Sequence, residues 1–275
     1  MRVAVTGASG GIGRWVVREL RGAEHEVLAL DNRPSDVVEG VTMLDVADPR
    51  ATVAALRGVE AVVHLAAVPG TRTPDWDAFD PNVVTTYHVL EAVRAHGIPR
   101  AVLASSIWAY GYNPPAEDRL PPRIPLVEDD LVPTVNGYGL SKRLLEQMGR
   151  EYVGATGCQV VCMRYPWVVQ PARYPGGPLG DPSSLPCRAE LWSYVDVRDV
   201  ALACRLAVER EGLGFVALNI GAADTRSALP SEDLVRRFAP GAEVTRALAG
   251  YEALYSIERA RTLLGYEPRH SWRNP

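Results

Sequence analysis

The segment from Val3 to Gly13 reads Val-Ala-Val-Thr-Gly-Ala-Ser-Gly-Gly-Ile-Gly, an apolar run followed by closely spaced glycines. The run before Gly7 predicts a strand, and the pattern after Gly13 predicts a helix. In such a turn Gly7 permits the sharp bend, Gly10 allows a pyrophosphate to approach the backbone, and Gly13 allows close helix packing. The phosphates would lie at the helix N-terminus. The opening therefore predicts a dinucleotide site, and a tight turn with no ligand is the alternative.

Apolar runs alternate with helical patterns along the rest of the chain. Continuous apolar strands are typical of a parallel sheet that is buried on both faces, and βαβ alternation predicts a doubly wound sheet. The expected strands are Val3–Val5, Val27–Leu30, Val41–Leu44, Ala61–Leu65, Ala101–Ala104, Val160–Met163 and Phe215–Ile220. The expected helices are Ile12–Leu20, Ala51–Leu56, Val83–Ala95, Tyr138–Val153, Val197–Glu209, Ser231–Phe238 and Ser256–Leu264.

Two segments rich in turn residues, 113–133 and 166–186, are expected as loops over the carboxyl edge of the sheet. Residues 1–163 and 193–221 are expected to form the dinucleotide-binding core. Residues 164–192 and 222–275 are expected to form a small, C-terminal substrate-binding lobe.

Composition narrows the partners. A net charge of −4 without a basic run argues against nucleic acid, and no stretch of 18 apolar residues suits a membrane. The first residues read as a strand, so no signal peptide is expected. The four cysteines lack metal-site spacing, which favours free thiols in a reducing cytoplasm and no bound metal. A polar small molecule is the expected partner.

Asp31 ends the second expected strand, 18 residues after Gly13, where a carboxylate can accept hydrogen bonds from the adenosine ribose. That placement favours NAD, because the carboxylate would repel a 2′-phosphate. Arg33 could pair with such a phosphate, so NADP remains possible. A simple turn role for Asp31 is the alternative. Asp45, after the third strand, could accept from the adenine amino group or serve as a turn or N-cap residue.

Of the 29 basic residues, Lys142 is the only lysine, and it lies one helical turn after Tyr138. A tyrosine with an ordinary pKa of about 10 is a poor base at neutral pH, and a nearby ammonium favours its phenolate. The ammonium could also donate to the nicotinamide ribose, which a broad guanidinium would not do in the same way. The pair is therefore predicted to be catalytic; an exposed aromatic and a solvated charge are the alternative.

Ser106 follows the fifth expected strand, at the edge where open α/β sheets bind ligands. Its hydroxyl is the preferred hydrogen-bond donor to a substrate oxygen that changes charge. Ser105 could hold that role instead, and either serine could simply satisfy the backbone at the strand end.

These motifs, TGxxGxxG, SSxxxYG and YxxxK, resemble the extended short-chain dehydrogenase/reductase family of the NAD-dependent epimerase/dehydratase type. The likeness covers nearly the whole chain, with further matches at 65–67, 194–201 and 256–268. It implies a Rossmann fold and a homodimer, with Tyr138 as general acid/base, Lys142 as its partner and Ser106 as the substrate-oxygen donor. The implied cofactor ligands are Gly7, Ser9, Gly10, Gly11, Ile12, Gly13, Asp31, Asn32, Arg33, Asp45, Val46, Leu65, Ala66, Ala67, Asn82, Tyr138, Lys142 and Tyr165.

The family resemblance leaves the reaction open between dehydrogenase and epimerase or dehydratase. Nucleotide-sugar epimerases of the family hold the nucleotide with a long segment where this chain has only residues 171–191. The chain is more similar to uronate dehydrogenase-like members, which oxidise a free sugar acid. Arg188 would then bind a substrate carboxylate, unless it pairs with Asp181 or Glu190. The expected substrate-binding residues are Ser106, Ile107, Trp108, Trp167, Arg188 and Trp192.

We therefore expect an NAD-dependent oxidoreductase for a small sugar, sugar acid or related alcohol. A sugar or nucleotide-sugar epimerase/dehydratase is the alternative. A dinucleotide sensor without activity is a weaker one, because both Tyr138 and Lys142 are present.

Overall fold

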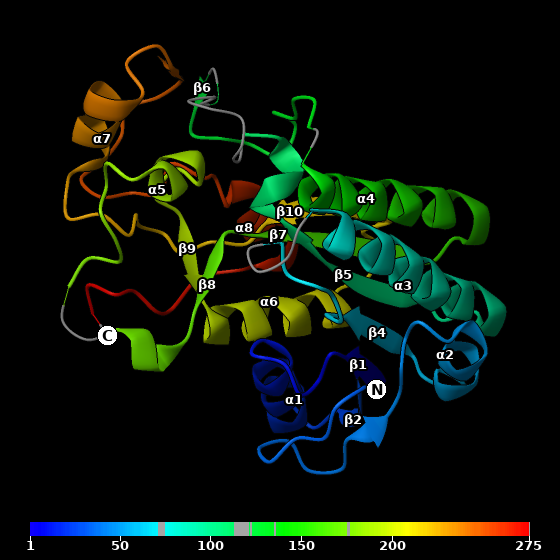
Figure 1. Ribbon diagram of the computed structural model, residues 1–275. Coiled ribbons are helices and arrows are strands. Elements are labelled where there is room, and N and C mark those ends of the chain that lie inside the picture. The colour runs from blue at the N-terminus through cyan, green and yellow to red at the C-terminus, as the bar shows by residue number, and fades with distance from the viewer. Residues whose placement is uncertain (71–74, 113–120, 122, 135, 175–176, 275) are drawn as a thin grey trace.

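A seven-stranded parallel sheet organises the molecule, seen in a computed structural model that describes residues 1–70, 75–112, 121, 123–134, 136–174 and 177–274 (Figure 1). The strands in spatial order are β3 (Thr42–Met43), β2 (Glu26–Asp31), β1 (Arg2–Thr6), β4 (Ala61–His64), β5 (Arg100–Ser106), β7 (Gln159–Tyr165) and β10 (Phe215–Asn219). Because the order reverses at β1, loops after β1 and β4 diverge and leave a crevice at the carboxyl edge. The expected doubly wound Rossmann sheet is confirmed.

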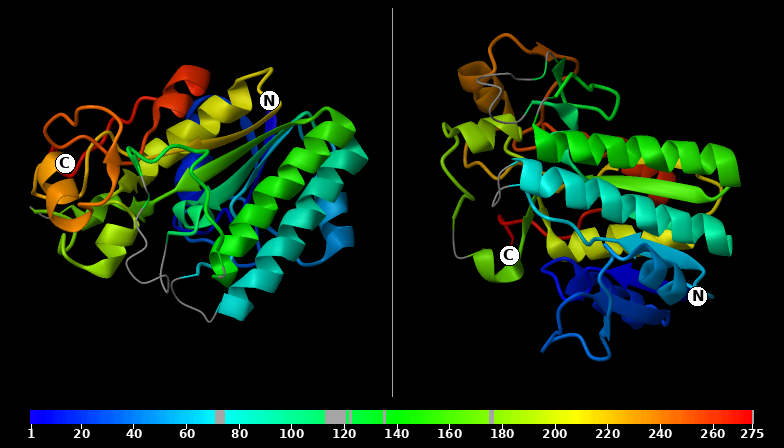
Figure 2. Two further views of the ribbon diagram at one scale, coloured as in Figure 1. Left: turned by 90° about the horizontal axis from the view of Figure 1, so that it is seen from above. Right: turned by 45° about the vertical axis from the view of Figure 1, so that its right-hand side comes forward.

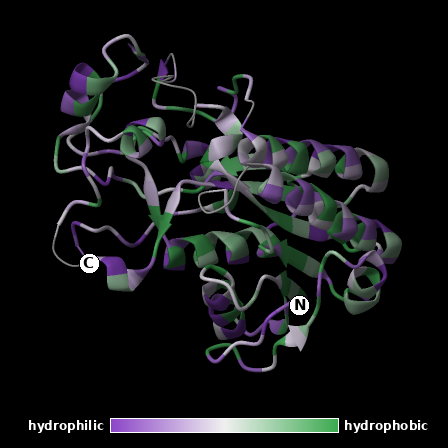
Figure 3. Ribbon diagram, viewed as in Figure 1, coloured by the Kyte–Doolittle hydropathy of each residue, from purple (hydrophilic) through white to green (hydrophobic). Residues whose placement is uncertain are grey.

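Helices cover both faces of this sheet (Figure 2). One face carries α1 (Gly13–Gly22), α6 (Val197–Glu209) and α8 (Glu258–Leu264). The other carries α2 (Pro49–Ala55), α3 (Asp75–His96) and α4 (Gly137–Thr156), and α3 lies along α4. The sheet is therefore buried on both sides, and every residue of β7 is buried. For the same reason the strands of the sheet are continuous apolar runs in the sequence. Figure 3 shows the same concentration of hydrophobic residues on the central strands.

A small lobe stands beyond the carboxyl edge of the sheet, on the left in Figure 1. Its core joins aromatic and aliphatic side chains from four parts of the chain, among them Tyr110, Leu126, Trp192 and Tyr255. Its elements are η1 (Ile107–Tyr110), β6 (Arg123–Ile124), α5 (Leu185–Ala189), α7 (Ser231–Phe238) and β11 (Glu243–Val244), with β6 paired to β11. The lobe's core thus also contains Ile107, Tyr110, Tyr112, Ile124 and Leu126, which lie within the range expected to form the dinucleotide core.

The expectation of an irregular loop at 166–186 was wrong at its two ends, whereas residues 177–184 are in no helix or strand, as expected. The segment contains β8 (Trp167–Val169), the short helix η2 (Pro171–Arg173) and the start of α5, and β8 pairs with β9 (Tyr194–Asp196). This strand is too short for periodicity to reveal, and its partner lies 27 residues away in the chain. Of the other expected loop, 113–133, residues 113–120 and 122 lie outside the described residues. Helix α3 begins earlier than expected, because Pro81 is accommodated inside it.

A buried ion pair joins the sheet, helix α4 and the lobe. The Arg164 guanidinium, at the end of β7, donates to both carboxylate oxygens of Glu146 on α4, at 2.8 and 2.7 Å. Arg164 also donates to the carbonyl of Glu128 at 2.6 Å and accepts at its own carbonyl from the Tyr255 hydroxyl at 2.8 Å. Burial opposes the charge of Arg164, but Glu146 outweighs it and holds the pKa of that guanidinium above its ordinary value.

We expect Glu146→Gln to lower the free energy of unfolding by about 3 kcal/mol, because it leaves a buried guanidinium without its counter-charge. The matched control is Glu151→Gln on the exposed side of the same helix, which should change stability by less than about 0.5 kcal/mol. Urea denaturation followed by circular dichroism measures both. Equal stability of the two variants would show that the pair is not structural.

Candidate active site

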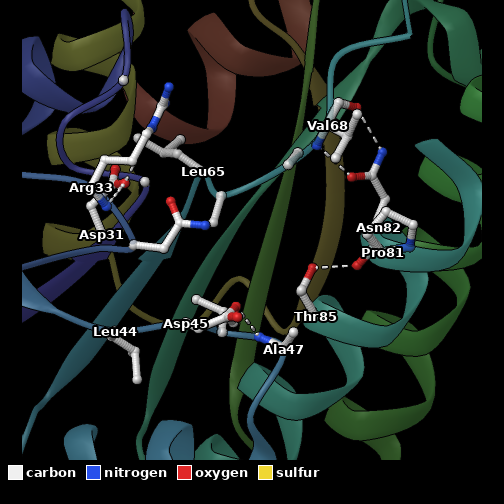
Figure 4. A pocket seen from close by; sticks show the side chains of 16 residues that line it. Asp31, Arg33, Leu44, Asp45, Ala47, Leu65, Val68, Pro81, Asn82 and Thr85 are labelled. Atoms are coloured by element: carbon white, nitrogen blue, oxygen red, sulfur yellow. Dashed lines mark hydrogen bonds and ion pairs between the residues drawn. The ribbon is translucent and has the colours of Figure 1, made fainter. Parts of the chain in front are cut away.

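Loops from neighbouring strands meet at the carboxyl edge of the sheet around a cleft of about 530 Å³ (Figure 4). The strand register brings them level, since Thr6 lies beside His64 and Ser106 lies beside Tyr165. The cleft runs from the glycine turn after β1, past the end of β2, to the loop between β4 and α3. Parallel packing of the strands is therefore what assembles the site.

Two glycines of the turn, Gly7 and Gly13, have no room for a side chain. Gly7 has φ +72°, and a Cβ there would lie 2.8 Å from the backbone nitrogen of Ala66. A Cβ on Gly13 would lie 2.0 Å from the Gly7 carbonyl oxygen. The turn and helix α1 consequently pack too closely for any other residue, and the turn leaves the N-terminus of α1 facing the carboxyl edge, where a pyrophosphate fits.

Asp31 lies at the end of β2 with only 5% of its surface exposed. Its two carboxylate oxygens accept backbone N–H groups from Ser9, at 2.9 Å, and Arg33, at 3.0 Å. A carboxylate has about four acceptor positions, so capacity remains for two ribose hydroxyls. The Arg33 side chain is exposed, with its Nε 4.0 Å from Asp31. This donor and acceptor set fits the adenosine end of NAD.

The far wall of the cleft is held by Asn82. Its side-chain oxygen accepts from the Val68 N–H at 2.7 Å, and its amide donates to the Val68 carbonyl at 3.0 Å. Asn82 therefore fixes the loop after β4. Asp45 accepts from the Ala47 N–H at 2.9 Å in a turn and also lines the cleft.

Most of the expected cofactor residues line this cleft. They are Gly7, Gly10, Asp31, Asn32, Arg33, Asp45, Val46, Leu65, Ala66, Ala67 and Asn82. Ser9, Gly11, Ile12 and Gly13 form the turn and the start of α1 beside it. Five further residues that line the cleft were not predicted: Leu44, Ala47, Val68, Pro81 and Thr85. Leu44, Ala47 and Val68 follow β3 and β4, so the position of the strand ends could have indicated them.

Tyr165 differs from the expectation. Its hydroxyl lies in the core, donating to the Met163 sulfur at 3.2 Å and lying 3.4 Å from the Cys204 sulfur. The ring belongs to the core that packs under α1 and α6. Its side chain is therefore not a cofactor ligand, because β7 directs it toward the helices rather than toward the carboxyl edge. Only its backbone lies level with Ser106.

Tyr138 and Lys142 share one face of α4, as expected. The Lys142 Nζ lies 5.5 Å from the centre of the Tyr138 ring and donates to the carbonyl of Ala104, at 2.8 Å. Burial lowers the pKa of Lys142 to about 8. Burial raises the pKa of Tyr138, and a hydrogen bond with the Ser106 side chain acts in the opposite direction. Serine, tyrosine and lysine are thus brought together around one phenol.

The two candidate serines have different surroundings. Ser105 donates its hydroxyl to the buried Glu146 carboxylate at 2.6 Å, and this bond faces the core. The Ser106 oxygen accepts the Trp108 N–H at 3.2 Å, which leaves the hydroxyl proton available to a second partner. This arrangement supports Ser106 over Ser105 as the donor beside Tyr138.

Two glycines and one glutamine that hold the site were not predicted. A Cβ on Gly70 would lie 2.3 Å from the Tyr138 ring, and one on Gly139 would lie 2.5 Å from the Trp108 carbonyl oxygen. Gln170, after β8, donates to the Gly11 carbonyl at 3.2 Å and so ties the glycine turn to the rest of the edge. Gly139 follows Tyr138 and Gly70 follows Pro69, and glycines at such positions could have indicated a close approach of another segment. Nothing in the sequence indicates Gln170.

The expected substrate-binding residues fall into two groups, those with partly exposed side chains and those buried in the core of the small lobe. Trp108 packs edge-on against Tyr138, with ring centres 5.7 Å apart, and Trp167 and Arg188 are partly exposed. Trp192 is a correction: it is fully buried, packs on Phe238 and donates its indole N–H to the Pro182 carbonyl at 2.8 Å. Ile107 is likewise a core residue of the small lobe. Their backbone positions direct both side chains into that core.

Two charged residues that lie near the expected substrate-binding residues, Arg226 and Glu190, were not predicted as site residues. Arg226, after β10, lies over the Trp167 ring at 5.0 Å and pairs with Glu190 at 2.9 Å. Glu190 was considered only as a partner of Arg188.

The four cysteines are buried and free. Within the described ranges there is no group of side chains suited to a metal ion, and no helix there is long and apolar enough to span a membrane.

Comparison with known proteins agrees with this geometry. Uronate dehydrogenase of Agrobacterium fabrum is 36% identical over 59% of the chain, which spans 60% of that enzyme's length. UDP-glucose 4-epimerase of Corynebacterium glutamicum is 28% identical over 98% of the chain and 92% of the enzyme. A short-chain dehydrogenase/reductase superfamily protein from Agrobacterium tumefaciens, solved with bound NAD, superposes with a TM-score of 0.74 at 25% identity, covering 99% of this chain and 94% of that one.

The family model described as the NAD dependent epimerase/dehydratase family matches residues 3–221. The match includes the glycine turn, Asp31, Ser106, Tyr138 and Lys142. The chain therefore belongs to the NAD-dependent epimerase/dehydratase family, within the extended short-chain dehydrogenases/reductases.

Proposed function

We propose that this protein oxidises a hydroxyl-bearing carbon of a small free sugar, sugar acid or related alcohol and releases NADH. The observation that carries the proposal is the convergence of Ser106, Tyr138 and Lys142. Tyr138 lies against Gly70, two residues after Val68 in the wall of the cleft. NAD, when bound, supplies the acceptor for the hydride that leaves the substrate carbon. Tyr138, in its phenolate form, accepts the proton of the substrate hydroxyl as the hydride leaves the carbon, and the C–O single bond becomes a carbonyl.

The side chains around Tyr138 tune that proton transfer. In the ligand-free protein burial holds the phenol protonated, because its pKa is raised. The Lys142 ammonium, with a pKa of about 8, is still mostly charged at pH 7 and favours the phenolate. Ser106 donates to the substrate oxygen, which fixes its distance from Tyr138. Trp108 forms an apolar wall against the sugar ring.

A small substrate is favoured because little chain is available to hold a nucleotide. Residues 171–191 contain η2 and α5, and α5 is bound to Arg226 through the Pro186 carbonyl. The alignment with the epimerase runs over 314 positions although this chain has 275 residues, so the epimerase contains segments that this chain lacks. An epimerase must retain its keto intermediate, whereas a dehydrogenase releases it. The full-length likeness keeps epimerisation as the second candidate.

The resemblance further implies a cytoplasmic homodimer. Helices α3 and α4 lie side by side, and α3 exposes Val84 and Tyr87, 44% and 48% of their surfaces. Such apolar side chains suit a helix-paired interface between two copies.

The direct test is a screen of NADH formation with free aldoses, uronic acids and nucleotide sugars. We expect one NADH per sugar oxidised with a free sugar. The opposite result is interconversion of a nucleotide-linked sugar without net NADH, by enzyme that purifies with tightly bound NAD. That outcome would replace the dehydrogenase with the epimerase.

Tyr138→Phe is expected to lower kcat by about a thousandfold or more, because the proton acceptor is lost, while NAD affinity changes little. Tyr152→Phe on the same helix is the control; its hydroxyl donates to Glu91, away from the site, and its kcat should stay near that of the wild type. Steady-state kinetics and NAD titration measure both. Turnover of Tyr138→Phe above about a tenth of wild type contradicts the assigned role.

Lys142→Arg should reduce both kcat and NAD affinity, because a planar guanidinium cannot occupy the space of an ammonium between the phenol and a ribose. Arg150→Lys, an exposed basic position on α4, is the matched exchange in the opposite direction and should alter neither. Normal kinetics and normal NAD titration of Lys142→Arg would mean that the single lysine lies there by coincidence.

We expect NAD to bind at least about tenfold more tightly than NADP, because the Asp31 carboxylate opposes a 2′-phosphate. Asp31→Asn removes the charge at constant shape and should shrink the preference. Fluorescence titration with both cofactors gives the ratio. Equal affinities in the wild type would indicate that Arg33 dominates this end of the cleft.

A further inference from the structure

A chain of side-chain contacts leads from Tyr138 to a buried ion pair. Trp108 meets Tyr138 edge-on, with an interplanar angle of 79°. Burial raises the pKa of Glu190, which follows α5, and the Arg226 charge and the Trp108 side chain act on it in the opposite direction. Glu190 is therefore one side chain away from the proposed catalytic phenol, although neither residue neighbours the other in sequence.

Glu190 holds Arg226 in a fixed place. The Arg226 Nη2 lies 2.9 Å from a Glu190 oxygen and 3.2 Å from the Pro186 carbonyl, and the guanidinium stacks on Trp167 at 5.0 Å. The two side chains are 6% and 16% exposed. An arginine held by these contacts against the Trp167 ring has the geometry to bind a carboxylate, but Glu190 already occupies that position.

Such a pair contributes little net stability, because desolvation offsets much of the attraction between the charges. The pair has a larger effect on the charge that the site presents to a substrate than on stability. The intact pair has no net charge, so it offers no free cation to an anionic substrate. Removing either member leaves a single buried charge of known sign.

We propose that the Glu190–Arg226 pair determines substrate charge: it masks Arg226 and so favours a neutral sugar or polyol over a sugar acid. The inference rests on the proposed function and narrows its substrate class. A sugar acid would have to displace Glu190 from Arg226, which leaves a buried carboxylate unpaired. A neutral sugar needs no such displacement and can bind against Trp108 and Trp167 through its ring.

The test compares kcat/KM for two sugars that differ only at C6, galactose and galacturonate, and repeats the comparison with glucose and glucuronate. Glu190→Gln unmasks Arg226 and should raise the acid-to-neutral ratio at least about tenfold. Arg226→Gln leaves Glu190 unpaired and should lower the ratio. Glu190→Gln with Arg226→Gln should return the ratio toward that of the wild type. Because the single changes act in opposite directions, one folded variant suffices.

The control is Glu19→Gln, which breaks the Arg205–Glu19 pair of 2.8 Å between α1 and α6. It should leave the ratio unchanged. A purely structural role for Glu190 would lower kcat/KM for both sugars equally, and a ratio within about twofold of wild type overturns the inference alone. If the wild-type enzyme forms no NADH with any of the four sugars, and none with any other free sugar, the proposed function is overturned instead.

Discussion

The buried pair of Arg164 and Glu146 is the contact on which the site depends most. It links β7 to α4, the helix that carries Tyr138 and Lys142, and Glu146 also accepts from Ser105, next to Ser106. Through the carbonyls of Glu128 and of Arg164 itself, it reaches the small lobe. The helix that carries Tyr138 and Lys142, the strand that carries Ser105 and Ser106, and the lobe are thereby fixed by one set of charge-assisted bonds, which tolerate little displacement.

The two halves of the site use different chemistry. The dinucleotide half is mostly backbone: glycines that exclude side chains, a helix N-terminus, and Asp31 held by two N–H groups. That half can stay the same whatever the substrate. The proposed substrate half is built from side chains of the lobe, where Glu190 interacts with both Trp108 and Arg226. Differences in specificity can therefore arise in the lobe without disturbing cofactor binding.

Most of the central sheet was predictable, because buried parallel strands are continuous apolar runs and the helices between them keep their period. Helices α6 and α7 begin and end where the sequence predicts. The short strands β6, β8, β9 and β11 were not predicted, since strands of two or three residues have no period and exist only through partners far along the chain. Trp192 and Tyr165 were wrongly predicted to face the site, because the local sequence does not indicate in which direction a side chain points.

The sequence by itself determined the glycine turn, the carboxylate that ends β2, and the Tyr138–Lys142 pair, because each depends on spacing within one turn or one strand–helix unit. Only the tertiary structure decided between Ser105 and Ser106, through the Glu146 carboxylate 41 residues away. It alone brought Arg226 to Glu190 across 36 residues. Long-range pairing of buried polar groups depends on how the lobe packs against the sheet, and no local pattern in the chain carries that information.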